Sequence, residues 1–295
     1  MEKSISTRKA FDGSVFLPLF TVAALVVSSA VVGCCSSPCC GGACDAVSEE
    51  GFVPLFNGRD LTGWIGAVDM YGVEIVKVPV SDGRGEMESA VLSCFPERKV
   101  KGSKVDNLCT EKEFGNFILR FDFCLPKNGN NGLGVRMAGP ETHAAYNAMC
   151  ELQLLDDGGD KYYDAATRKD KLEPCQYTGS VYGVVPARRD NFDPKMAADC
   201  SGGGSYVKKA GNWNSAEVRV VGSRIQMVLN GVMVTDTDVS RFKGDGTDTP
   251  DGKKHPGLHL KRGRIGWLGH GFHVMWRNIR IKELPDGASL GATCP

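Results

Sequence analysis

The sequence has no excess of charge of either sign, because 35 lysines and arginines balance 35 aspartates and glutamates. Proteins that bind nucleic acid carry a basic excess, so nucleic acid is not an expected partner. Acidic runs of the kind that form solvating tails are also absent. This balance favours a small neutral ligand or a locally charged pocket.

Several common catalytic and binding motifs are missing as well. The chain contains no GxSxG nucleophile elbow, no HExxH metal motif and no phosphate-cradling glycine loop. Its aspartate-rich stretches at 156–160 and 245–248 do not have the EF-hand spacing. A proline and a glycine separate His255 from His259 and argue against a helical metal pair. The corresponding enzyme and binding classes therefore have no support.

Helical periodicity is almost lacking, apart from one candidate turn at 194–198. Short segments instead alternate apolar and polar residues, which is the period of a half-buried strand. Strands are expected at 89–94, 117–125, 132–136, 150–155, 216–221, 224–229 and 274–282. Hairpin turns are expected at 221–224 and at Asn230-Gly231. Many strands without helices between them predict an all-β sandwich or barrel.

The first 34 residues have the features of a secretory signal. Basic residues open the segment, an apolar run covers 15–32, and a glycine precedes Cys34. This ending resembles a bacterial lipobox, in which Cys34 would receive lipid and anchor the protein to a membrane. The alternative is an uncleaved membrane-spanning segment. We expect a lipid-anchored protein of the cell envelope that faces the periplasm or the cell surface.

The rest of the chain divides into a tether, one domain and a tail. Residues 35–50 are small, polar and cysteine-rich, residues 51–284 form the expected domain, and residues 285–295 form a loose tail. Two long excursions, at 156–212 and 240–263, interrupt the strand pattern. Excursions of this length in a compact domain are usually functional or disordered loops.

The cysteines do not follow a zinc-binding pattern. Those of the tether have no histidine nearby, so disulfides or further acylation are expected there. Beyond the tether the number of cysteines is odd, at seven, so they cannot all pair with one another. Cys175 and Cys200 flank a long loop and are the expected disulfide.

The most informative polar cluster lies on two expected strands. Glu151 and Gln153 share one face of the strand 150–155, and Arg136 ends the strand before it. Such groups are costly to desolvate unless they are paired. Because β-sandwich proteins commonly hold sugars on a sheet face lined with polar side chains, this is a candidate sugar-binding face. The alternative is a solvent-exposed face on which Arg136 and Glu151 form an ion pair.

A second cluster lies near the end of the domain, where Trp267 and His270 occupy a glycine-rich turn. Histidine suits proton transfer near neutral pH, although a single histidine is more often an ordinary surface or core residue. Trp267 is either an aromatic platform for a ligand or part of the core. Trp64, Trp213 and Trp276 are assigned to the core.

Six short motifs, in order, resemble those of the 3-keto-disaccharide hydrolase domain family, which is also described as 3-keto-glucoside 1,2-lyase/3-keto-2-hydroxyglucal hydratase. They are Phe52–Trp64, Asn131–Arg136, Glu151–Asp156, Thr178–Pro186, Gly211–Asn214 and Gly266–Leu284. The resemblance implies an antiparallel, concanavalin-like β-sandwich of jelly-roll type with long functional loops. It also implies export, often as a lipoprotein. Trp267 and Gly269 depart from the residues that the family usually has before the histidine.

The resemblance further implies a 3-keto-glycoside substrate. A ketone at C3 acidifies the proton on C2, and the enolate formed by its loss can expel the aglycone from C1. Glu151 or His270 would then transfer the proton, and Arg136 or a bound divalent metal ion would stabilise the enolate oxygen. The residues that would bind or orient the sugar are Asn131, Gln153, Asp156, Tyr182 and Trp267.

Two other functions stay open. The same polar residues suit a lectin-like surface module that binds glycans without catalysis. A structural surface protein, its tether locked by disulfides, is the third alternative.

Overall fold

The computed structural model describes residues 49–79, 84–141, 149–164, 166–167, 169–189, 200 and 205–290. The signal segment with Cys34, most of the tether, the candidate turn at 194–198 and the end of the tail lie outside the described residues. In the part of the chain that is described, no helix has the length and apolar character needed to cross a membrane.

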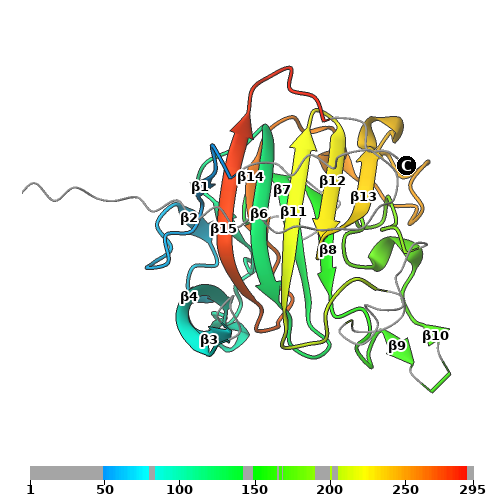
Figure 1. Ribbon diagram of the computed structural model, residues 1–295. Coiled ribbons are helices and arrows are strands. Elements are labelled where there is room, and N and C mark those ends of the chain that lie inside the picture. The colour runs from blue at the N-terminus through cyan, green and yellow to red at the C-terminus, as the bar shows by residue number, and fades with distance from the viewer. Residues whose placement is uncertain are drawn as a thin grey trace, which may run out of the picture. The chain divides into compact units, whose positions relative to one another are not determined.

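Two antiparallel sheets form the domain, and Figure 1 looks onto the larger one. Its strand order is β13-β12-β11-β6-β15-β4-β3, with β1 paired to β15. These strands are β1 (Val53–Pro54), β3 (Tyr71–Pro79), β4 (Glu86–Cys94), β6 (Asn116–Cys124), β11 (Trp213–Val221), β12 (Arg224–Leu229), β13 (Val232–Asp238) and β15 (Met275–Leu284).

The smaller sheet lies behind the larger one in Figure 1 and has the order β2-β5-β14-β7-β8. Its strands are β2 (Trp64–Gly66), β5 (Leu108–Thr110), β14 (Arg264–Trp267), β7 (Asn130–Met137) and β8 (Cys150–Leu155). The loops carry a small ribbon, β9 (Tyr163–Asp164) with β10 (Lys169–Asp170), and the 3-10 turns η1 (Pro96–Arg98), η2 (Pro174–Gln176), η4 (Val239–Arg241) and η5 (Pro256–His259).

Strand alternation builds the core between the two sheets. On β6, Phe117, Leu119, Phe121 and Phe123 are buried against the smaller sheet, whose Leu133 is equally buried. Each such side chain contributes about 1.5–3 kcal/mol of transfer free energy. The expected all-β antiparallel sandwich is therefore confirmed.

Local turn chemistry also agrees with the sequence. The β11–β12 hairpin closes at 221–224, and Asn230 (φ 49°) with Gly231 (φ 85°) joins β12 to β13 in the left-handed conformation that a tight hairpin requires. β14 lies in a region that we expected to be a glycine-rich turn. The glycine at 266 is needed for packing, because a Cβ there would lie 2.5 Å from the carbonyl oxygen of Leu108 on the neighbouring strand.

The expected Cys175–Cys200 disulfide is wrong. Cys175 has a free thiol and lies buried in η2. Its burial raises the pKa of the thiol, which keeps it protonated and unreactive.

Candidate functional site

The outer face of the smaller sheet, the face turned away from the core, places two polar side chains opposite glycines. Glu151 pairs with Gly134, and Gln153 pairs with Gly132, in the register between β7 and β8. Because neither glycine has a side chain, the sheet has room on this face for the longer polar groups of β8. Alternation therefore creates a local polar surface on an otherwise buried strand.

Glu151 is the most unusual group on this face. Its side chain is only 6% exposed, and no partner for its carboxyl group is found among the described residues. The carboxyl group lies over Gly132, where an added Cβ would be 2.2 Å from Oε1. Burial raises the pKa of Glu151 to about 8, since removal of water disfavours the charged form. Such a group can accept or donate a proton near neutral pH.

Three further polar side chains share the face of Glu151. Gln153 is buried, and its Oε1 accepts a hydrogen bond from the backbone of Leu154 at 3.2 Å. Asn130 also lies on this face by alternation, and its buried Oδ1 has no partner in the described structure. Tyr182 is half-buried and donates its backbone N–H to the carbonyl of Glu151 at 3.0 Å. Asn130 and Tyr182 are half-buried, so the cluster is open to solvent at these two residues.

Asn131 lies on the opposite, core-facing side of β7, which corrects its expected role in sugar binding. Its side chain donates to the carbonyl of Leu268 at 2.5 Å and accepts from the backbone of Gly132 at 2.9 Å. The bond to Leu268 holds β7 against the segment after β14, and the bond from Gly132 fixes the Asn131 side chain within β7. The asparagine on the face of Glu151 is Asn130, which sequence reasoning missed.

Arg136 does not reach Glu151, so neither the expected ion pair nor its placement at the enolate oxygen holds. Its guanidinium donates to the carbonyl of Gly222 at 2.6 Å, in the β11–β12 turn, and to that of Leu260 at 2.7 Å. The cause is a bulge beside β14, where Arg136 has φ 57° and alternation is interrupted. Arg136 links the two sheets and is a structural residue.

Replacing Arg136 by methionine is expected to lower the free energy of unfolding by roughly 2–4 kcal/mol, because two part-buried hydrogen bonds from a charged, buried donor are lost. Urea unfolding measures this change. Arg219→Met, which removes a more exposed arginine paired with Glu217, is the matched control and should cost less than about 1 kcal/mol. Turnover lost without any loss of stability would return Arg136 to the catalytic set.

Trp267 is fully buried in the core, so it cannot serve as a platform for sugar. Its ring stacks on Trp276 at 4.9 Å between centroids and meets Phe121 edge-on at 5.0 Å. Alternation along β14 turns Gly266 outward and Trp267 inward. Trp276 and Trp64 are buried as expected, whereas Trp213 is only half-buried.

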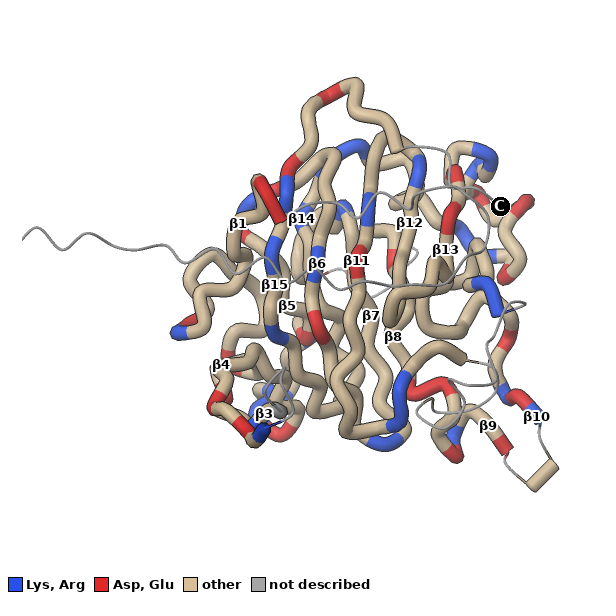
Figure 2. The backbone as a smooth tube through the Cα atoms, in the orientation of Figure 1, with Lys and Arg blue, Asp and Glu red and all other residues tan. Residues whose placement is uncertain are grey.

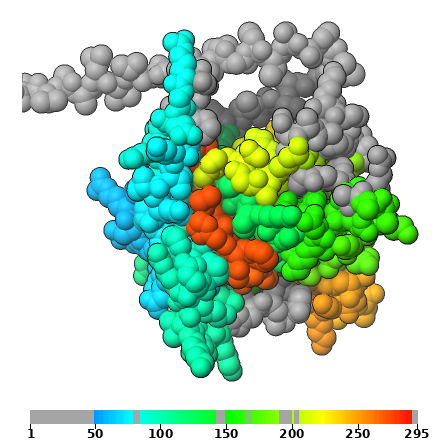
Figure 3. Space-filling view, turned by 90° about the horizontal axis from the view of Figure 1, so that it is seen from below, coloured from blue at the N-terminus to red at the C-terminus, as the bar shows by residue number. Residues whose placement is uncertain are grey.

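His270 lies at the end of the smaller sheet, beyond β14, and no contact with Glu151 is recorded. In the view from below, the orange-red segment after β14 lies between the teal segment after β4 and the green segments that follow β6 and β8 (Figure 3). The residue is open to solvent, yet the surrounding protein lowers the pKa of His270, while Asp106 opposes this shift and Lys161 adds to it. The shift favours the neutral imidazole.

Asp156 ends β8 at the same end of the sheet. Its Oδ2 accepts a hydrogen bond from the backbone of Asn128 at 2.8 Å. Burial raises the pKa of Asp156, and this hydrogen bond partly offsets the increase. The carboxyl group thus holds the β6–β7 loop at the end of β8.

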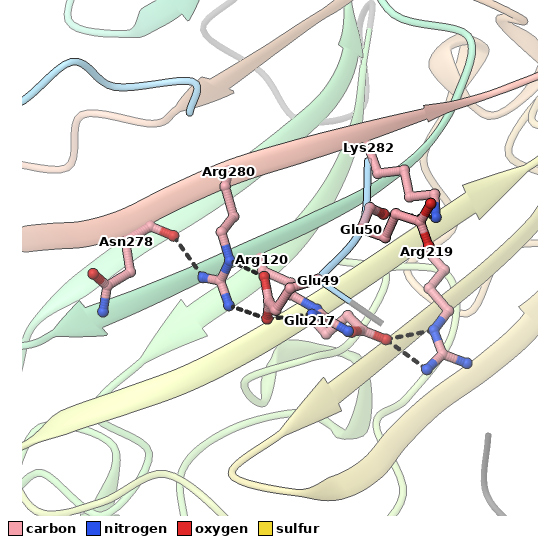
Figure 4. Close-up of polar contacts among 8 residues, drawn as sticks. All are labelled: Glu49, Glu50, Arg120, Glu217, Arg219, Asn278, Arg280 and Lys282. Atoms are coloured by element: carbon pink, nitrogen blue, oxygen red, sulfur yellow. Dashed lines mark hydrogen bonds and ion pairs between the residues drawn. The ribbon is translucent and has the colours of Figure 1, made fainter. Parts of the chain in front are cut away.

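The outer face of the larger sheet carries a second polar cluster, in which the charges neutralise one another. Figure 2 shows both acidic and basic residues on β6 and β11 and mainly basic residues along β15. Glu217 pairs with Arg120 and Arg219, and Glu49 pairs with Arg120 and Arg280 (Figure 4). Each of these charges has a partner, whereas Gln226 of β12, which pairs with Arg219 and so lies on the same face, is buried and has no partner for its amide among the described residues.

No group of three or more potential ligand side chains is arranged to hold a metal ion within the described ranges. The candidate site therefore consists of Glu151 with Asn130, Gln153 and Tyr182, and of His270 at the end of the sheet.

Comparisons with known proteins agree with the β-sandwich fold and identify the family. The model of the 3-keto-alpha-glucoside-1,2-lyase-like domain matches residues 51–282. A 3-keto-disaccharide hydrolase of Bacteroides thetaiotaomicron is 25% identical over 81% of this chain and 80% of its own length. Two crystal structures from Parabacteroides distasonis, of proteins proposed to be glycosyl hydrolases, each have a TM-score of 0.55. They are 27% and 25% identical, covering 79% and 80% of this chain and 99% and 95% of their own.

Proposed function

This chain belongs to the 3-keto-alpha-glucoside-1,2-lyase-like family, and we propose that it cleaves 3-keto-glycosides by removing the proton on C2 and eliminating the aglycone from C1. The observation that carries the proposal is Glu151, a buried carboxyl group with a raised pKa and no partner among the described residues. Such a group is costly to the fold and suits proton transfer.

Glu151 acts as the base. In its ionised form it takes the C2 proton, and the electron pair of the C2–H bond forms the enolate of the C3 ketone. The enolate then breaks the bond between C1 and the glycosidic oxygen, and this oxygen leaves with a proton as the free aglycone alcohol. Addition of water to the resulting unsaturated ketosugar yields the 3-keto-sugar. A base with a pKa of about 8 accepts a proton from carbon better than an ordinary carboxylate.

The amide side chains beside Glu151 orient the sugar. Asn130 accepts a hydrogen bond from a sugar hydroxyl at Oδ1, the atom for which the described residues offer no partner. Because Oε1 of Gln153 already accepts from the backbone, its NH₂ group donates to the substrate, and the C3 oxygen is the position at which such a donor stabilises the enolate. His270, at the open end, serves proton exchange with the leaving group.

The test is to incubate purified protein with the 3-keto form of a chromogenic glucoside and to follow release of the aglycone. Release that depends on the 3-keto group, with the unoxidised glucoside left intact, is the expected outcome. Saturable binding of unmodified glycans with no turnover of the keto form would instead support the lectin-like alternative, which the same amide groups would serve.

We also propose that the protein is exported and anchored by lipid at Cys34, in the cell envelope. The support is the basic start, the apolar run and the glycine before Cys34 in the sequence. Mass spectrometry of the mature N-terminus tests this, since a diacylglyceryl-modified cysteine should be its first residue.

A further inference from the structure

The segment 240–263, one of the two expected functional excursions, packs near Glu151 at two places. One is the start of β8, and the other is the Tyr182–Gly183 turn. η5 lies so close to the start of β8 that a Cβ on Gly257 would be 2.1 Å from the carbonyl oxygen of Met149. The backbone N–H of Asp251 donates to the carbonyl of Gly183 at 3.3 Å. Gly183 follows Tyr182, whose own N–H is bonded to Glu151.

The half-buried Asp251 and the buried His255 form a pair within this segment. Nε2 of His255 lies 3.0 Å from Oδ1 and 3.2 Å from Oδ2 of Asp251, and the His255 side chain is 4% exposed. The backbone N–H of His255 donates to the carbonyl of Gly244 at 2.8 Å. The pair is thus fixed both through its side chains and through the loop backbone.

The pair fills the space beside the Tyr182–Gly183 turn. A Cβ on Gly183 would lie 2.3 Å from Oδ2 of Asp251 and 3.0 Å from Cε1 of His255. Gly183 has φ 73°, a conformation that glycine adopts without strain. The turn can therefore approach the pair closely, and any shift of the pair is transmitted to Tyr182 and the strand edge at Glu151.

We propose that the Asp251–His255 pair is a positioning device that locks the Tyr182–Gly183 turn against β8 and so keeps the surroundings of Glu151 dry. The inference rests on the proposed function only in taking Glu151 as the proton-transfer residue. Among the described residues, neither member of the pair contacts the carboxyl group of Glu151. Both therefore act through the turn. Sequence reasoning considered His255 only as a metal ligand and had no signal for this role.

The test compares His255→Phe, which keeps the ring but removes the bond to Asp251, with His255→Gln, which keeps a donor near Nε2. His259→Phe is the matched control, because His259 is exposed in the same segment. The pKa of Glu151 is measured by carboxyl-carbon NMR, with Glu151→Gln to assign the signal. Loss of the lock admits water, so the pKa should fall from about 8 towards its ordinary range in His255→Phe.

In the same variants, kcat for the keto-glucoside should fall about tenfold in His255→Phe with KM nearly unchanged, and His255→Gln should restore most of both readouts. An unchanged Glu151 titration in a folded His255→Phe protein would overturn the inference. If the titration moves but wild-type protein shows no turnover, the proposed function fails and the positioning role stands.

Discussion

Glu151→Gln is expected to lower kcat for 3-keto-glucoside cleavage by about 10²–10⁴-fold, the usual contribution of a general base, while KM changes little. Glutamine has nearly the same shape, so the sheet face stays intact and only the proton acceptor is lost. In wild type, kcat/KM should rise with pH and level off above about 8, where Glu151 is ionised. Glu88→Gln, at an exposed position on β4, is the control and should match wild type.

Glu151→Gln should also stabilise the protein at alkaline pH. The folded state keeps the Glu151 proton up to about pH 8, whereas the unfolded chain releases it near the ordinary carboxyl pKa. Between these two values the folded state holds more protons, so the free energy of unfolding falls as pH rises, by at most about 1.4 kcal/mol per pH unit. Urea unfolding at pH 5 and pH 8 should show this decrease in wild type and a smaller one in Glu151→Gln. Identical pH dependence in both proteins would refute the raised pKa.

Gly132→Ala is expected to lower kcat about 100-fold, because the new methyl group would overlap the Glu151 carboxyl group. A Cβ on Gly132 would lie 2.2 Å from Oε1, 2.8 Å from Cδ and 2.9 Å from Cγ of Glu151. The side chain must therefore rotate away from the bound sugar. Displacement by about an ångström is enough for a rate loss of this size.

Gly134→Ala is the control for Gly132→Ala, since both alter one glycine on the same face of β7. A Cβ on Gly134 meets the side chains of Met137 and Met149 rather than the carboxyl group of Glu151. Methionine is flexible and can move aside. Kinetics and urea unfolding of both variants should show similar costs in stability but a much smaller kinetic effect for Gly134→Ala. Equal kinetic losses would mean that this face does not hold the reacting group.

The alternation of β7 and β8 could be predicted from sequence, and it placed Glu151 and Gln153 together correctly. The same rule, applied to β7 from Gly132 backwards, selects Asn130 and not Asn131 for that face. The signal was thus present in the sequence, but the motif drew attention to the wrong asparagine. Two-residue periodicity is reliable here because β7 and β8 pair in unbroken register over 130–135 and 150–155.

Arg136 and Trp267 show where the periodic rule fails. Arg136 sits in a bulge with φ 57°, a conformation set by packing of β7 on β14 and not by any local residue preference. Trp267 is buried because a strand forms there through pairing with β5 and β7, which lie far away in the sequence. Both outcomes depend on tertiary contacts, as does the raised pKa of Glu151.

A set of contacts made by Glu49, Glu50 and β1 holds the start of the described domain to the larger sheet, and we call it the latch. It determines how the domain bears a mechanical load at its N-terminus. Glu49 is held by Arg120 and Arg280, Lys282 donates to the carbonyl of Glu50 at 2.9 Å, and β1 pairs with only Ile281 and Arg280. Tension on the preceding chain would open these contacts one after another, because β1 is short and lies at the margin of the sheet. The latch can therefore yield and re-form while the strands that carry Glu151, in the other sheet, stay undisturbed.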